Sequence, residues 1–378
     1  SDRCGLERGT EFNGGSCLID PDGHLLCCAD TGPAIAYGEI DIKKARDKSF
    51  SGYGHKMRDR RPDAYMDIVL DPYLWEPSLG HGLYGHDPLP AGKATKIGVS
   101  QLMPVTGDKA ANMDRIEVEA KALSANGCEL IVFPELMLTG YPDAAGAKSM
   151  AETVPGASSD RLMDICLRYR VYMVIGMVEE DGGSLFNTAV LYSPEGILGK
   201  YRKMHLDQLD SAWAAGNLGL NYFNTAMGRI GILIGHDADF PETARIHALH
   251  GVDILCCPAA VSGPVPEPLA ESRTWHKKTE PYGYTNIWWH LWRVRAGENN
   301  CYLAFANAVG KLPDGRECFG RSGVFQPMIW VYPRNEVILG TSGEDRAALA
   351  IDTRNGPDPD TDTSYTRKKY LMPMRRTI

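Results

Sequence analysis

The sequence has no long run of basic residues and no apolar run of transmembrane length. Its 378 residues carry 40 Lys and Arg against 48 Asp and Glu, a formal net charge of −8, so the basic face of a nucleic-acid-binding protein is not expected. The apolar stretch "CELIVFPELML" is about half as long as a bilayer requires. Ser1 leads directly into polar sequence, without the pattern of a signal peptide. These absences predict a cytoplasmic protein with neither membrane nor nucleic-acid partners.

The ten cysteines lack the C-x-x-C spacing of common metal sites. Several lie in apolar runs, such as Cys256 and Cys257 in "DILCCPAA", where a reduced thiol behaves as a small hydrophobic group. The pattern predicts reduced core thiols and no metal ion.

From Lys96 onward, apolar runs alternate with segments of helical spacing. This alternation predicts an α/β protein in which helices cover a sheet. We expect strands over residues 96–102, 128–135, 171–180, 187–194, 229–235, 252–260 and 301–310, and helices over 108–127, 158–170, 241–251 and 285–300.

The N-terminal region contains a partial internal repeat. "GGSCLIDP" (14–21) aligns without gaps with "GRSGVFQP" (320–327), "DRCG" (2–5) with "NAVG" (307–310), and "YGEIDIKKAR" (37–46) with "ALAIDTRNG" (348–356). Three ordered matches predict that residues 1–75 copy a late part of the main domain. Residues 76–92, rich in Pro and Gly, are interpreted as a linker, and residues 93–378 as the domain itself.

Three stretches are candidates for chemistry. Glu135 ends the very apolar run "IVFPE", where desolvation would raise the pKa of its carboxyl and suit a general base, although a strand-end Glu can also cap the next segment. Lys203 in "YRKMHL" could stabilise an oxyanion or simply lie on the surface. "GRIGILIGHDADFPE" (228–242) indicates a strand, a sharp turn and a helix start, with Gly235 at the turn, where many hydrolases hold a nucleophile.

Together and in this order, these stretches resemble the nitrilase, or carbon–nitrogen hydrolase, superfamily. The resemblance rests on "PELMLTGY" (134–141), "YRKMHL" (201–206), "GHDADFPE" (235–242), "RAGENN" (295–300) and "FANAVG" (305–310). It implies a four-layer αββα sandwich over residues 93–378 and a Glu–Lys–Cys triad in which a thiolate attacks an amide or nitrile carbon. The N-terminal copy fits too, because "RRPDAY" (60–65) resembles the family's C-terminal tail.

The sequence departs from the family at two points. Gly235 stands at the position of the nucleophilic cysteine, and the second glutamate that the family often places between Lys and Cys has only Asp207 or Asp210 as counterparts. Three explanations for Gly235 stay open: an engineered substitution, a natural pseudoenzyme, or another group in the role of the nucleophile. His236 could be a ligand or an acid–base group, or could hydrogen-bond locally.

The resemblance implies hydrolysis of a non-peptide carbon–nitrogen bond in a small amide or N-carbamoyl compound, in the amidase- or formamidase-like branch. Glu135, Lys203 and the position of Gly235 are the implied catalytic set. We expect Tyr141, His236 and Asp237 to bind substrate, with no cofactor, and the chain to form a homo-oligomer or pair with a partner nitrilase domain. The alternative is a catalytically silent subunit with a structural or regulatory role for an active partner.

Overall fold

The computed structural model describes residues 3–21, 25–29, 32–50, 54–69, 90–263, 287–327 and 335–354. The chain divides into two compact units: residues 1–50 with 265–290, and residues 51–264 with 291–378. Most of the predicted linker, and the aromatic-rich stretch 272–286, lie outside the described residues.

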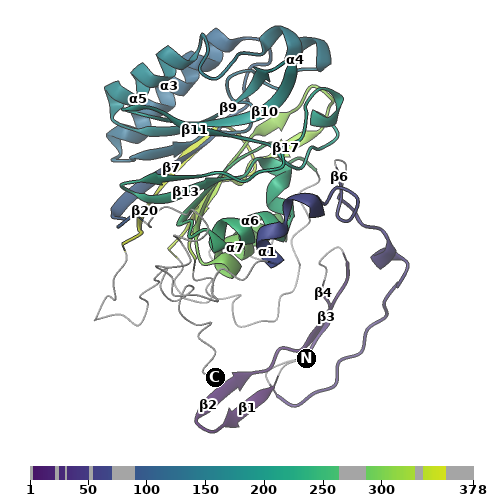
Figure 1. The fold of residues 1–378 in the computed structure, drawn as a ribbon. Helices are drawn as coiled ribbons and strands as arrows, with labels where there is room; N and C mark the ends of the chain where they lie inside the picture. Colours follow the sequence, from purple (N-terminus) through teal and green to yellow (C-terminus); the bar gives the residue numbers. More distant parts are fainter. Residues whose placement is uncertain are drawn as a thin grey trace. The chain divides into compact units, whose positions relative to one another are not determined.

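The larger unit contains two six-stranded sheets stacked face to face (Figure 1). The first has the order β11-β10-β9-β8-β7-β20, with parallel pairing only between β7, β8 and β9. Its strands are β7 (Ala94–Gln101), β8 (Leu130–Val132), β9 (Tyr172–Asp181), β10 (Ser184–Ser193), β11 (Gly196–Arg202) and β20 (Asp345–Asp352). The second has the order β12-β13-β14-β15-β18-β19. Its strands are β12 (Tyr222–Thr225), β13 (Gly228–Ile232), β14 (Ile254–Ala259), β15 (Tyr302–Asn307), β18 (Gly323–Phe325) and β19 (Val337–Ile338).

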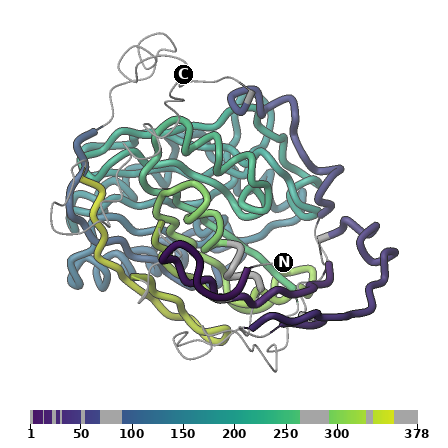
Figure 2. The backbone as a smooth tube through the Cα atoms, turned by 90° about the horizontal axis from the view of Figure 1, so that it is seen from below, coloured from purple at the N-terminus to yellow at the C-terminus, as the bar shows by residue number. Residues whose placement is uncertain are grey.

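Helices cover the outer face of each sheet, which completes the four-layer αββα sandwich that the sequence predicts. The first sheet is covered by α3 (Lys109–Ala125), α4 (Ala144–Met150) and α5 (Ser159–Tyr169), and the second by α1 (Met66–Val69), α6 (Pro241–Leu249) and α7 (Ile287–Asn299) (Figure 1). From the direction of Figure 2, α6 and α7 lie in front of the second sheet.

One apolar core fills the space between the sheets. Val99, Leu130 and Val174 of the first sheet pack with Ile232 and Cys256 of the second, and all five are fully buried. A second core, which includes Ile116, Leu123 and Leu162, lies between the first sheet and helices α3 and α5. Alternate residues of each strand enter opposite cores, as the pleat requires.

Local signals set several boundaries. The carboxylate of Asp108 accepts a hydrogen bond from the N–H of Ala111 and caps α3. Helix α5 ends at Arg170 in the left-handed conformation, and α6 begins with Pro241 at its first position. The strand expected over 128–135 is shorter, because the chain leaves the sheet after Val132 and enters the turn that carries Glu135.

The described part of the smaller unit contains two short antiparallel hairpins. Strands β1 (Cys4–Glu7) and β2 (Thr10–Asn13) form one, and β3 (Cys17–Ile19) and β4 (Leu25–Cys28) form another; β5 (Ser49–Phe50) follows. In the larger unit β6 is Gly54–His55, and β16 (Val309–Lys311) pairs with β17 (Glu317–Phe319). Among the described residues, no helix has the length and apolar character to cross a membrane.

Candidate functional site

Glu135 and Lys203 form a buried ion pair. Lys203 follows β11, and its Nζ donates to Glu135 Oε1 at 2.7 Å, with both side chains no more than 4% exposed. The N–H of Lys203 also donates to the carbonyl oxygen of Asn187 at 2.8 Å, which ties the loop after β11 to β10. The Asn187 side chain donates to the same oxygen of Glu135 at 2.7 Å, so Glu135 Oε1 accepts two hydrogen bonds. The other oxygen, Oε2, lies beside Gly235.

A glycine on the neighbouring strand makes room for the Glu135 turn. A Cβ on Gly176 of β9 would lie 2.4 Å from the backbone nitrogen of Leu136 and 3.2 Å from the carbonyl carbon of Glu135. Any larger residue at 176 would push the turn away from the sheet. Leu136 itself has a φ of 49°, a conformation that non-glycine residues seldom adopt.

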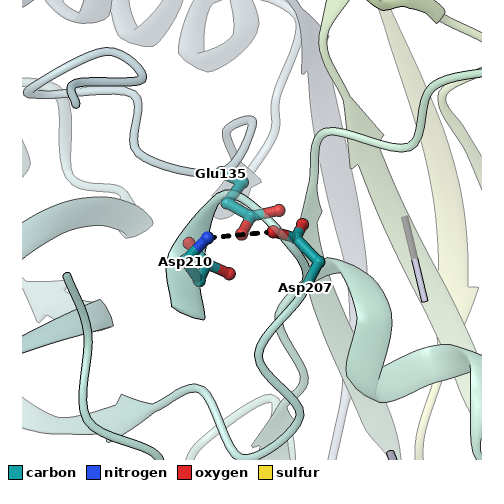
Figure 3. Close-up of side chains that lie close together, drawn as sticks. All are labelled: Glu135, Asp207 and Asp210. Atoms are coloured by element: carbon teal, nitrogen blue, oxygen red, sulfur yellow. Dashed lines mark hydrogen bonds between the residues drawn. The ribbon is translucent and has the colours of Figure 1, made fainter. Parts of the chain in front are cut away.

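Two aspartates lie beside Glu135 and complete a carboxylate cluster (Figure 3). Asp210 accepts a hydrogen bond from Lys203 Nζ, and Asp207 Oδ2 lies 3.4 Å from the same nitrogen. Oxygens of Glu135, Asp207 and Asp210 all lie within 4.8 Å of one another, a grouping that could hold a cation. The Lys203 ammonium lies among these oxygens, hydrogen-bonded to Glu135 and Asp210.

Burial and mutual repulsion change the ionisation of this cluster. Burial raises the pKa of Glu135, against the attraction of Lys203. Burial and the neighbouring Asp207 raise the pKa of Asp210 to about 7. Burial opposes the charge on Lys203, but the three carboxylates together raise its pKa well above the usual value. One lysine among three carboxylates therefore favours a proton retained on the cluster near neutral pH.

Gly235 lies directly against Glu135. It follows β13 at the start of a 3-10 turn over Gly235–Asp239, is buried, and has a φ of 46°. A Cβ at this position would lie 2.5 Å from Glu135 Oε2. The structure therefore brings Glu135, Lys203 and Gly235 together, as their motifs predict.

The carboxylate of Asp237 fixes the 3-10 turn through hydrogen bonds with its surroundings. One of its carboxylate oxygens accepts from the N–H of Ile234 at 3.0 Å and from the hydroxyl of Tyr201 at 2.8 Å. The other accepts from the backbone N–H of His205 and contacts its Nδ1, each at 2.8 Å. Asp237 is fully buried and is not among the residues that line the pocket described below, so this geometry gives it a positioning role.

His236 points toward a segment near the N-terminus. Its Nδ1 lies 2.7 Å from Asp239 Oδ2, and its Nε2 lies 3.7 Å from Asp59 Oδ2. A Cβ on Gly54 would lie 2.6 Å from His236 Nε2, so only glycine fits there without a shift. Burial opposes protonation of His236, but Asp239 raises its pKa overall. His236 does not line the pocket either, and its predicted contact with substrate stays a prediction.

The same segment, residues 54–69, packs along the 3-10 turn and α6. Arg60 pairs with Glu242, and Asp67 lies 2.6 Å from His250 Nε2. The hydroxyl of Tyr65 lies 2.6 Å from His205 Nε2, which extends the Asp237 network to this segment. None of these partners was predicted from the sequence, because about 140 or more residues separate them and no local pattern links them.

A small pocket that opens to solvent lies over Glu135. Tyr141 lines it, and its buried hydroxyl has no hydrogen-bond partner among the described residues. The pocket thus combines carboxylates, an unused hydroxyl and apolar walls, as a site for a small polar molecule does. Its lining is Glu135, Leu136, Tyr141, Pro142, Asp207, Leu209, Asp210, Trp213, Ala260, Leu312 and Arg316.

Comparisons with known proteins find relatives of this chain. Residues 96–336 match the family model described as carbon-nitrogen hydrolase. A nitrilase of Pyrococcus abyssi is 31% identical over 61% of this chain and 81% of its own length. An omega-amidase of Danio rerio is 29% identical over 68% of this chain and 87% of its own. Among solved structures, a mutant amidase from Nesterenkonia sp. AN1 in complex with butyramide aligns with a TM-score of 0.56 at 24% identity, covering 70% of this chain and 94% of that one, which supports the fold.

Proposed function

Because the chain belongs to the carbon–nitrogen hydrolase family, we propose that its site recognises a small amide or N-carbamoyl compound without thiol-dependent turnover. The observation that carries this proposal is Gly235: the buried Glu135–Lys203 pair faces a residue with no side chain, and Glu135 Oε2 fills the space where a nucleophile's Cβ would lie. Acyl transfer through a covalent intermediate requires a nucleophile at this point.

The pocket offers specific groups to an amide. Glu135 Oε2 can accept a hydrogen bond from the amide nitrogen, since Oε1 is the oxygen that Lys203 and Asn187 use. The hydroxyl of Tyr141 can donate to the carbonyl oxygen. The Lys203 ammonium is already surrounded by three carboxylates, and a ligand oxygen reaches it most easily in place of Asp207, the most distant of them.

The nearby thiols are poor substitutes for the absent nucleophile. Cys257 on β14 is fully buried, and its pKa is raised well above the usual value by burial and by neighbouring carboxylates, against a hydrogen bond with the Gly235 backbone. Burial also raises the pKa of Cys318, whose surroundings include Glu135. A thiolate is the reactive form, so neither residue provides one near neutral pH.

Turnover through another group is the competing proposal, and a structural or regulatory role for an active partner is compatible with ligand recognition. The test is calorimetric titration of the full chain with butyramide, the ligand of the Nesterenkonia amidase complex, alongside an assay for ammonia release. We expect binding without ammonia release. Ammonia release that iodoacetamide abolishes would show that a thiol acts as nucleophile and would reject the proposal.

A matched pair of variants locates the binding. Tyr141→Phe removes only the hydroxyl and is expected to weaken butyramide binding about three- to tenfold, the effect of about one hydrogen bond. Tyr37→Phe, at a side chain that is 82% exposed, is the control and should bind as the original chain does. Equal affinity of the two variants contradicts the assignment of this pocket.

A further inference from the structure

The hairpin β1–β2 has the same strand register as the hairpin β16–β17 of the main domain. An offset of 305 residues for the first strand and 306 for the second matches all three pairs of β16–β17 to pairs of β1–β2. Cys4↔Asn13, Gly5↔Phe12 and Leu6↔Glu11 correspond to Val309↔Phe319, Gly310↔Cys318 and Lys311↔Glu317. The bond that closes each hairpin also corresponds: Gly14 N–H to Arg3 oxygen at 2.9 Å, and Gly320 N–H to Ala308 oxygen at 3.1 Å.

The next hairpin continues the correspondence. Strand β3 matches β18 at the offset of 306, and its pairs Cys17↔Cys28 and Leu18↔Cys27 correspond to Gly323↔Ile338 and Val324↔Val337. The third and second residues before each strand share a left-handed backbone, with φ of 71° and 80° at Gly14 and Gly15, and 66° and 58° at Gly320 and Arg321. The repeat predicted from the sequence thus has a counterpart in backbone conformation and pairing.

The two copies differ in what surrounds them. In the main domain, β18 pairs with β15, and Val324 and Phe325 are fully buried. In the N-terminal copy, the corresponding Leu18 and Ile19 are 38% and 59% exposed. Among the described residues, β3 pairs with β4 alone. In the N-terminal copy, the two apolar side chains are therefore exposed and one edge of β3 is unpaired. In the main domain, the corresponding side chains are buried and the corresponding edge pairs with β15.

We propose that residues 3–29 bind a second carbon–nitrogen hydrolase domain, by adding β3 to the edge of that domain's equivalent of β15. The internal copy shows the mode of binding: antiparallel pairing with the edge strand, and insertion of two apolar side chains into the core beneath it. The β15 edge of this chain's own domain is filled by β18, so the partner is a domain of the same family whose edge is open. This inference does not depend on whether the site at Gly235 binds or turns over a ligand.

The experiment supplies such a domain in a tandem protein. Residues 90–305, which include β7 to β14 and the first four residues of β15, are placed directly before Ser1 of the full chain. At the offset of 305, Ser1 and Asp2 then take the places of Ala306 and Asn307, and the N-terminal copy follows β15 as the late segment does in the main domain. The readout is alkylation of Cys17 by iodoacetamide, followed by mass spectrometry of its peptide. Cys17 is exposed in the chain, and its counterpart Gly323 is buried beside β15.

We expect Cys17 to react at least about tenfold more slowly in the tandem protein than in the full chain, as a residue taken into a folded sheet does. Ile19→Asp in the tandem protein should restore the fast reaction, because a carboxylate cannot enter the core unpaired. Ile35→Asp is the matched control: Ile35 is 79% exposed and lies outside all three matched stretches of the repeat, so protection should persist.

A second tandem protein, in which residues 90–354 precede Ser1, supplies the added domain with its own late strands. Here the edge is filled, and Cys17 should react as fast as in the full chain. Equal reactivity of Cys17 in both tandem proteins and the chain alone overturns the proposal, whether or not the added residues fold. Protection that survives Ile19→Asp overturns it as well.

Discussion

Glu135 Oε2 lies 2.5 Å from the point where Gly235 would carry a Cβ. A side chain at position 235 therefore cannot be accommodated unless Glu135 or the turn moves. The obstructing atom is the end of a flexible carboxylate, so the site can still admit a side chain if Glu135 turns aside. The predictions below follow from this relationship and from the charges around it.

Gly235→Cys is expected to create a reactive thiol at a modest cost in stability. The φ of 46° costs an L-residue about 1–2 kcal/mol. The Lys203 ammonium and the start of the 3-10 turn favour the thiolate, while Glu135 opposes it, and we expect the first two to prevail and hold the thiol pKa below its usual value. Alkylation rate against pH, followed on the peptide that contains residue 235, measures it.

Gly219→Cys is the control for this variant. Gly219 is exposed and a Cβ there would meet nothing within 4 Å, so its thiol should titrate ordinarily. If the thiol at 235 titrates at or above the pH of the thiol at 219, the site around Gly235 has lost the electrostatics of a nucleophile position.

Lys203→Met should be strongly destabilising. It removes the cation from a buried cluster of three carboxylates while keeping a side chain of similar length. Removing one partner of a buried ion pair typically costs about 3–5 kcal/mol. Urea denaturation measures the loss, and Lys121→Met on the exposed face of α3 should change the free energy of unfolding by less than about 0.5 kcal/mol. Similar urea midpoints for Lys203→Met and Lys121→Met would contradict a stabilising role of the Lys203 ammonium among the three carboxylates.

Asp210 should make stability fall as the pH rises. Its pKa is raised from the usual 3.8 to about 7, so between these values the folded chain keeps a proton that the unfolded chain has released. Stability therefore decreases from about pH 4 to about pH 7 and levels off above, and the raised pKa of Glu135 acts in the same direction. The pKa of Asp207 is lowered from 3.8, so this residue changes the pH dependence of stability only below about pH 4, outside this window.

Asp210→Asn is expected to flatten this decrease, because the amide does not titrate. The melting temperature measured from pH 4.5 to pH 8 would show it, with Asp114→Asn as the exposed control that leaves the slope unchanged. If the melting temperature of Asp210→Asn falls with pH as steeply as that of the original chain, a group other than Asp210 retains the proton.

Tyr65→Phe tests the attachment of residues 54–69. The variant keeps the ring but leaves His205 Nε2 without the Tyr65 hydroxyl, at an expected cost of about 1 kcal/mol. Because His205 contacts Asp237, amide hydrogen exchange at Ile234 should accelerate as well. Tyr37→Phe should leave the free energy of unfolding and the exchange rate at Ile234 unchanged. If the exchange rate at Ile234 is also unchanged in Tyr65→Phe, residues 54–69 do not stabilise the turn at Gly235.

The sequence predicted the strands with long apolar runs and the helices with clear amphipathic spacing, and missed the elements that depend on context. Helix α4 has the sequence "AAGAKSM", with no apolar stripe, and β11 has the sequence "GILGKYR", in which two glycines and a basic end interrupt a short apolar run. Glu135, Lys203 and Gly235 were found because each lies in a contiguous motif. Asn187 was not, since its role arises only when β10 brings it beside Glu135.

The hydrogen bonds to Asp237 hold the turn without help from residue 235. The conformation of this turn is therefore set by Asp237 and not by the side chain at position 235. A substitution at 235 can change the chemistry of the pocket while the sandwich and its two apolar cores stay as they are.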